Sequence, residues 1–199
     1  MNQRKKQPAQ TRQAIFAAAG AGFASGGYAG TGLGTIVAAA GLTKGALFHH
    51  FKDKQSLALG WIAGDLAEAM ALNWVEPLQG IGSLDALKSF CRSRCLGIQS
   101  ADAASALVSL AAEIAAEEPA LREALERVFA GWRDGFAAVL ERGKVAGWIH
   151  RSINPAVEAA FLVSAISGLT VTAKAAPEEI TRRTSATALE GYLETLRAQ

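Results

Sequence analysis

Hydrophobic residues recur along most of the chain with the spacing of α-helices rather than that of strands. Ile15, Ala18, Ala19 and Phe23, for instance, follow the i, i+3, i+4, i+8 pattern of one helix face. Ala dominates the composition, and only five of the 199 residues are Pro. β-Branched residues rarely alternate with polar ones. These features predict an all-α protein.

Helix start and stop signals divide this pattern into nine predicted helices. We expect them at about residues 9–24, 33–40, 44–50, 54–75, 83–99, 103–116, 119–148, 155–175 and 178–196. Gly41 supplies the turn between the second helix and the third. Asp53 caps the fourth helix, and Pro77 is expected to end it.

The second and third helices are short, and a turn containing Gly joins them within the stretch Gly27 to Lys54. This is the pattern of a helix-turn-helix, in which the later helix enters the major groove of DNA. Thr43 is a good N-cap for that helix. Its residues expected to face DNA are Lys44, Gly45, Ala46 and His49, and those expected to anchor it in the core are Leu47, Phe48 and Phe51.

Charge is distributed unevenly along the chain. Residues 1–52 carry six of the 20 basic residues and none of the 18 acidic ones. A basic end joined to an acidic remainder favours a polyanionic partner. A basic arm without a partner is the alternative, but Lys44 and Lys52 lie outside the arm. Lys54 falls in the first turn of a helix, where a positive charge is unfavourable, so a phosphate contact and a solvated lysine both remain open.

Several specific features occur together in residues 12–59. They are Phe23, Gly27-Tyr28, Thr31, Ile36, Ala40-Gly41-Leu42, Thr43-Lys44-Gly45 and His50-Phe51, followed by Lys54 and Leu57. With these features the first 60 or so residues resemble the DNA-binding head of the TetR family of transcriptional regulators. The resemblance implies a helical homodimer that binds a near-palindromic DNA operator and releases it when a small effector binds. It places Thr31, Thr43, Lys44, Phe48, His49 and Lys54 at DNA-contact positions.

Two positions depart from the family pattern. Gly32 stands where the family usually has Ser or Thr, and Phe48 stands where it usually has Tyr. Both changes remove a hydroxyl that would reach phosphate. We therefore expect this head to depend more on backbone amides, lysines and the basic arm than its relatives do.

The segment 155–175 is apolar on all sides, so it must be covered on all sides. It lies either at the centre of the core or between two subunits, and small residues in it favour a homodimer. The expected interface is Phe161, Leu162, Ala165, Gly168, Leu169, Leu189, Tyr192, Leu193 and Leu196. Its longest uncharged apolar run, residues 159–173, is shorter than the roughly 20 residues that a bilayer span needs. With no secretory signal at the N-terminus, we expect a cytoplasmic protein without a membrane segment.

We divide the chain into a basic arm (1–8), a helix-turn-helix domain (9–56) and an effector-binding and dimerisation domain (57–199). Aromatic and large apolar side chains of the last domain are candidates for an effector pocket, although such residues are more often core. They are Trp61, Met70, Trp74, Phe90, Leu110, Trp132 and Phe136. The unknown effector is expected to be small and apolar or amphipathic.

Cys91 and Cys95 lie four residues apart, so one helix face would carry both sulfurs. This spacing would suit a redox or electrophile sensor on the same scaffold, whereas buried structural cysteines are commoner. No set of residues suggests catalysis, a metal site or a cofactor. Together with the family resemblance, which implies a ligand-released repressor, this argues against an enzyme. The other alternative is a helical protein that binds a small molecule and carries a vestigial head.

Overall fold

The computed structural model describes residues 8–97, 102–114, 118–175 and 178–199. Over these ranges the regular elements are helices, and one isolated β-bridge pairs Ile149 with Arg197. The expectation of an all-α fold is therefore confirmed. Most of the basic arm, and the expected helix ends at residues 99 and 116, lie outside the described residues.

Each of the nine predicted helices has a counterpart in the described ranges. The N-terminal ones are α1 (Pro8–Gly30), α2 (Leu33–Ala39) and α3 (Lys44–His50). The fourth is a continuous run of α4 (Lys54–Trp61), η1 (Ile62–Leu66), α5 (Ala67–Met70), η2 (Ala71–Val75) and α6 (Glu76–Gln79), in which η1 and η2 are π-helical. The others are α7 (Leu84–Gly97), α8 (Ala103–Ile114), α9 (Pro119–Ala146), α10 (Pro155–Ala175) and α11 (Glu179–Glu194).

Two expected helix ends were wrong. The first helix does not stop at Ala24 but continues to a kink at Gly27, where φ is 71° and ψ is 175°. Pro77 does not end the fourth helix, because it lies in the first turn of α6 after the π-helical turn η2. A missing N–H has little cost in a first turn, so the run continues to Gln79.

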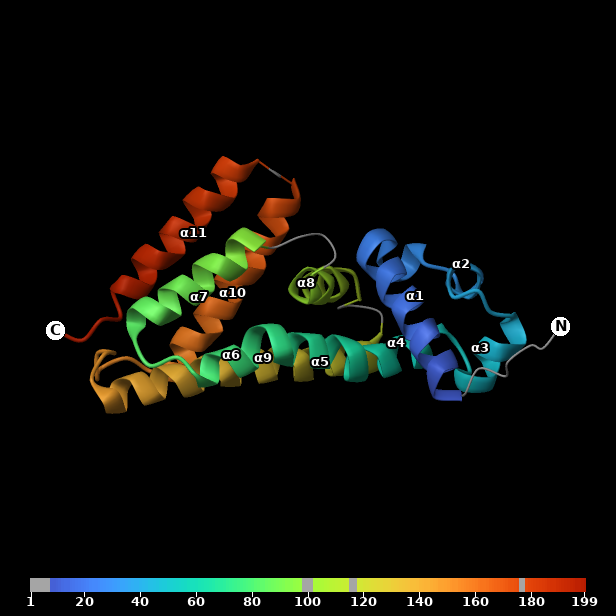
Figure 1. The fold of residues 1–199 in the computed structure, drawn as a ribbon, viewed down its shortest axis with the longest axis horizontal. Helices are drawn as coiled ribbons and strands as arrows, with labels where there is room; N and C mark the ends of the chain where they lie inside the picture. The colour runs from blue at the N-terminus through green and yellow to red at the C-terminus, as the bar shows by residue number, and fades with distance from the viewer. Residues whose placement is uncertain (1–7, 98–101, 115–117, 176–177) are drawn as a thin grey trace.

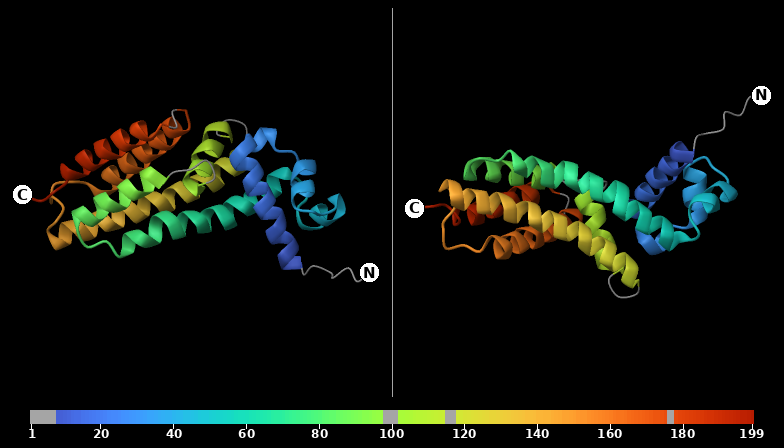
Figure 2. Two further views of the ribbon diagram at one scale, coloured as in Figure 1. Left: turned by 45° about the horizontal axis from the view of Figure 1, so that its top comes forward. Right: turned by 90° about the horizontal axis from the view of Figure 1, so that it is seen from below.

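The molecule is elongated, with α1–α3 at one end and α7, α10 and α11 at the other (Figure 1). The run α4–α6 leaves the N-terminal helices and lies beside α9 along the length of the molecule, as Figure 2 shows. Helix α8 crosses between the two ends and packs on both α1 and α10. The three helices α1–α3 are called the head below.

A single hydrophobic core connects the head to the rest of the molecule. In the head, the rings of Phe16 and Phe51 lie 5.3 Å apart, centroid to centroid. Between η2 and α9, the ring centroids of Trp74 and Trp132 are 4.8 Å apart, and both side chains are fully buried. Gly135 allows this close approach, since a Cβ there would lie 3.1 Å from Val75.

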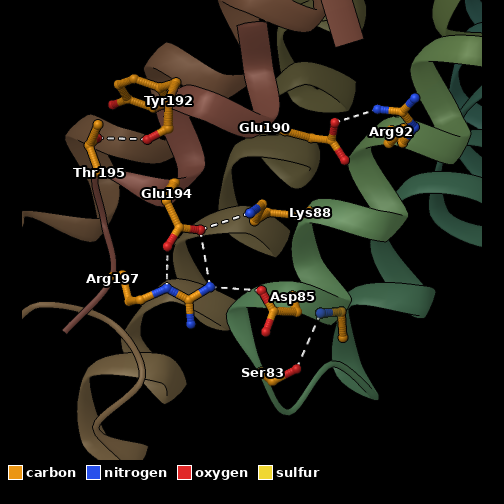
Figure 3. A network of polar contacts seen from close by, with 10 residues as sticks. Ser83, Asp85, Lys88, Arg92, Glu190, Tyr192, Glu194, Thr195 and Arg197 are labelled. Atoms are coloured by element: carbon orange, nitrogen blue, oxygen red, sulfur yellow. Dashed lines mark hydrogen bonds and ion pairs between the residues drawn. The ribbon is translucent and has the colours of Figure 1, made fainter. Parts of the chain in front are cut away.

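Ion pairs hold α7 against α11 at the end far from the head (Figure 3). Arg197 bonds Asp85 of α7 at 2.7 Å and also contacts Glu194, which accepts from Lys88 at 2.7 Å. Arg92 and Glu190 form a further pair between the two helices. These contacts fix the C-terminal residues to the start of α7.

The carboxylate of Glu194 predicts a pH dependence of stability. Hydrogen bonds from Arg197 and Lys88 lower the pKa of Glu194 to about 2. A carboxylate whose pKa is lowered by folding stabilises the protein above its ordinary pKa and loses this effect as the pH falls. Urea unfolding of the wild type and Glu194→Gln, followed by circular dichroism, should differ at neutral pH and converge between about pH 5 and 2. A difference that stays constant over this range would contradict the assignment.

Candidate nucleic-acid interface

The local sequence accounts for the geometry of the helix-turn-helix. Gly41 has a φ of 63°, a left-handed conformation that Gly adopts without strain. The Thr43 hydroxyl accepts a hydrogen bond from the Ala46 amide at 3.2 Å and so caps α3. Leu47 is fully buried and fixes α3 to the core of the head. The predicted cap, turn and Leu47 anchor of the motif are all present.

The outer face of α3 is open to solvent. Lys44, Gly45 and His49 are exposed, and Ala46 is half-buried. Phe48 was expected both as a core anchor and, from the family resemblance, as a DNA contact; 52% of it is exposed, so it is not an anchor. Its ring therefore lies on the outer face with Lys44 and His49 and is available for contact.

Thr31 has a different environment from the one expected of a DNA contact. Only 3% of it is exposed, and its hydroxyl donates to the Gly27 carbonyl at 2.7 Å. It stabilises the corner between α1 and α2 instead of presenting a hydroxyl at the surface. We leave Thr31 out of the contact set for this physical reason. The neighbouring Gly32 is the N-cap of α2 and offers no side-chain hydrogen bond.

Lys54 is half-buried against the head. Its Nζ lies 4.4 Å from the centroid of the Tyr28 ring and donates to the Ala29 carbonyl at 3.4 Å. Burial lowers the pKa of Lys54 below its ordinary value, and the charges of Glu113 and Glu118 offset only part of this effect. The Asp53 side chain caps α4 by accepting from the Ser56 amide, which gives Lys54 a fixed backbone position.

Arg12 is a basic residue that the sequence did not single out. Its guanidinium lies 5.1 Å from the centre of the Phe16 ring and 5.6 Å from that of Phe51. These cation–π contacts fix a positive charge on the head close to α3. No sequence motif marks Arg12, since the contact depends on how α1 packs against Phe51, the residue that follows α3.

The residues expected to form an effector pocket are mostly packed against one another. Trp74, Trp132, Phe136, Leu110 and Met70 are at most 2% exposed. Phe90 is half-buried, with its ring centroid 6.1 Å from that of Trp74. Trp61 does not join this group, because it packs on Phe23 in the head at 5.6 Å. Gly20 leaves room for its indole, since a Cβ there would lie 2.7 Å from Trp61 Nε1.

A groove of about 370 Å³ lies between α10 and α11. Six residues of the expected dimer interface line it, namely Phe161, Ala165, Gly168, Leu169, Leu189 and Tyr192. Phe161 is 47% exposed, and Val157 and Val171 on the same helix are 60% and 51% exposed. One side of α10 is thus apolar and uncovered within a single chain.

Three residues of the expected interface lie elsewhere. Leu162 and Leu193 are fully buried, and Leu196 is 4% exposed. They belong to the core of the single chain, because α10 and α11 each turn one face towards their own subunit. The prediction that α10 is apolar on every side did not separate these two faces.

Helix α10 also meets the length and composition of a membrane span, with 21 residues and a mean hydropathy of 1.6. Its uncharged run, residues 159 to 173, is shorter than the roughly 20 residues that a bilayer span needs. Some apolar side chains of α10 lie on the face that packs on α8 and α9, and the others lie on the open face described above. Length and apolar composition alone are weak evidence for a membrane segment.

The two cysteines are free thiols on the buried face of α7. Cys91 is fully buried and Cys95 is 4% exposed. Burial raises the pKa of Cys91 far above its usual range and that of Cys95 to about 12. Both are therefore thiols at neutral pH and poor nucleophiles. Within the described ranges no three His, Cys, Asp or Glu side chains group as metal ligands.

Comparison with protein families assigns both parts of the chain. Residues 15–60 match the model described as bacterial regulatory proteins of the tetR family. Residues 83–189 match the tetracyclin repressor-like C-terminal domain. The second match alone spans more than half of the chain.

Solved structures share the whole fold. A TetR transcriptional regulator from Chloroflexus aurantiacus has a TM-score of 0.85 at 26% identity, over 97% of this chain and 99% of that one. GusR of Salmonella enterica has a TM-score of 0.72 at 26% identity, over 96% and 98%. The reduced form of Escherichia coli NemR, at 20% identity and a TM-score of 0.81 over 94% and 97%, shares the fold alone.

Curated relatives match over the head and a little beyond. The regulator AcrR of Shigella flexneri is 48% identical over 58 residues, which is 29% of this chain and 27% of the relative. The repressor AcnR of Corynebacterium glutamicum is 37% identical over 79 residues, or 38% and 42% of the two chains. The chain thus aligns with less than half the length of these relatives.

Proposed function

Because this chain belongs to the TetR family of DNA-binding transcriptional regulators, a family without enzymatic activity, we propose that it is a cytoplasmic repressor released from DNA by a ligand. The observation that carries the proposal is the open outer face of α3. Lys44, Phe48 and His49 are exposed there above a buried Leu47 anchor. A rigid helix with such a face fits the major groove.

Each exposed group has a chemical role in this proposal. Lys44 donates to guanine O6 or N7, and His49 donates to or accepts from a base edge or a phosphate. Gly45 allows the backbone to approach closely. Thr43 and Lys54 contact phosphates, provided that the Lys54 ammonium leaves the Tyr28 ring. Phe48 makes an apolar contact, because it has no hydroxyl to offer a phosphate.

A near-palindromic operator requires two heads. We propose that a second copy of the chain covers the groove between α10 and α11, with Phe161, Gly168 and Tyr192 at its centre. The uncovered apolar side of α10 supports this arrangement. In such a dimer the two α3 helices enter successive major grooves about 34–36 Å apart.

The effector is proposed to be a small apolar or amphipathic molecule that binds in the C-terminal part. The aromatic core around Trp74 and Trp132 supports this class of ligand, although in the structure these side chains fill the interior. Binding would separate packed helices there and change the spacing of the heads. A change in spacing prevents both heads from docking at once.

Lys44→Ala should weaken binding to the chain's own upstream DNA by about 10-fold or more, because one good base contact contributes about 1–3 kcal/mol. Fluorescence anisotropy with labelled duplexes at several salt concentrations measures this. Arg151→Ala, an exposed basic residue in the turn after α9, is the control and should leave affinity unchanged.

Lys54→Ala should weaken binding to every sequence and flatten the salt dependence. The absence of any salt-dependent binding by the wild type would refute the proposal.

The two alternatives have less support. A cysteine sensor needs an accessible thiolate, whereas Cys91 and Cys95 are buried thiols with raised pKa values. Unmodified cysteines in mass spectra of peroxide-treated protein would exclude such a sensor. A vestigial head is hard to reconcile with an α3 helix that keeps its cap, anchor and exposed face.

A further inference from the structure

The corner between α1 and α2 has an unusual backbone. Helical geometry breaks at Gly27 and starts again at Tyr28. A restarted turn leaves its first amides, those of Tyr28 and Ala29, without acceptors in the preceding helix. A Cβ at Gly27 would lie 2.5 Å from Glu113 Oε2, and its φ of 71° suits Gly. The corner is thus shaped to admit a side chain from α8.

Glu113 supplies the two missing acceptors. Its Oε2 accepts from the Tyr28 amide at 2.7 Å, and its Oε1 accepts from the Ala29 amide at 2.6 Å. Both bonds are charge-assisted and therefore stronger than bonds between neutral groups. Glu113 belongs to α8, so these two bonds join α8 directly to the corner of the head.

A second carboxylate acts on the same region. Glu118, directly before α9, accepts a hydrogen bond from the Gln55 side chain in the first turn of α4. Burial raises the pKa of Tyr28, and the nearby charge of Glu118 raises it further. Lys54 lies beside Tyr28, with both Glu113 and Glu118 close enough to affect its charge. Glu113 of α8 and Glu118 before α9 therefore hold the end of α1 and the start of α4, respectively.

The corner that Glu113 holds leads directly into the helix-turn-helix. The Gly27 carbonyl accepts from the buried Thr31 hydroxyl at 2.7 Å, and α2 begins two residues later. A shift of α8 relative to α1 would pull on the amides of Tyr28 and Ala29. Through Thr31 the same shift would change the position of α2 and, with it, of α3.

We propose that Glu113 is the positioning residue through which α8 sets the orientation of the helix-turn-helix. Its carboxylate holds the head while α8 stays in place, and its release frees the α1–α2 corner. Glu113 acts through Tyr28 and Ala29 and does not touch DNA. This inference deepens the proposed function, on which it rests for its regulatory meaning, but the contact itself is testable without DNA.

Hydrogen exchange on the full chain, read by mass spectrometry with residue-level fragmentation, tests the contact. Glu113→Gln keeps the size of the side chain but removes its charge and one acceptor. We expect the amides of Tyr28 and Ala29 to exchange at least 10-fold faster, residues 33–50 to follow, and α9–α11 to stay unchanged. Glu123→Gln, at an exposed glutamate on α9, is the matched control and should change none of these rates. Unchanged rates in residues 33–50 would overturn the proposal.

Binding to DNA provides the second measurement. At fixed salt, Glu113→Gln should reduce the ratio of affinities for the upstream DNA and a random duplex by at least 5-fold, because a loosened head must be ordered on the specific site. An unchanged ratio, with circular dichroism showing a folded protein, would overturn the regulatory role. If the wild type does not prefer the upstream DNA over the random duplex, the proposed function fails. The exchange rates then still test whether Glu113 holds the amides of Tyr28 and Ala29.

Discussion

Gly168→Glu should leave the chain folded and reduce its affinity for the upstream DNA by about 100-fold or more. Gly168 is exposed on α10, and a Cβ built there meets no atom within 4 Å. A glutamate is therefore tolerated in a single chain. In the proposed dimer it would bury a carboxylate in the apolar groove beside Phe161 and Leu169, which is strongly unfavourable. Two linked heads bind DNA about 10²–10⁴-fold more tightly than one head alone, and a monomer loses this gain.

Sedimentation velocity and fluorescence anisotropy on the same samples check this result. Gly131→Glu is the matched control, since Gly131 is exposed in the middle of α9 and also has no atom within 4 Å of a built Cβ. Both variants replace a Gly inside a helix by Glu, so the change in helix propensity is the same in both. A difference between them therefore reports on the groove. A Gly168→Glu protein that sediments as the wild type does would remove this groove from the dimer proposal.

Periodicity and capping rules located the helices well because those rules act locally. Helix α3 begins and ends at Lys44 and His50 as expected, since the Thr43 cap and the Gly41 turn depend only on neighbouring residues. Pro77 misled the prediction because the π-helical turn η2 precedes it. The turn η2 packs along α9, a tertiary contact that the local sequence does not report.

Site residues were harder to assign because exposure depends on tertiary packing. Phe48 and Leu47 are both apolar neighbours on α3, yet one is 52% exposed and the other is fully buried. Thr31 fits a family pattern but is bonded inside the corner. Glu113 had no signal in the sequence, since its partners lie 84 and 85 residues away along the chain. Only the packing of α8 on α1 brings them together.

Trp132→Ala should lower the free energy of unfolding by about 3–5 kcal/mol, the usual cost of removing a fully buried Trp or Phe side chain. Trp132 is 0% exposed and packs at 4.8 Å from Trp74 and at 6.4 Å from Phe129. Its removal leaves a cavity between α9 and η2. Urea unfolding followed by circular dichroism measures the loss.

Trp132→Phe separates a packing role from a binding role at the same position. The indole Nε1 of Trp132 is buried without a hydrogen-bond partner in the part of the chain that the structure describes. An unsatisfied buried donor costs about 1–3 kcal/mol, so its removal offsets part of the lost packing. Trp132→Phe should therefore be about 1 kcal/mol or less below the wild type. A loss as large as that of Trp132→Ala would mean that the indole N–H is bonded in the purified protein, and would point to a bound molecule with an acceptor group at the centre of the C-terminal part.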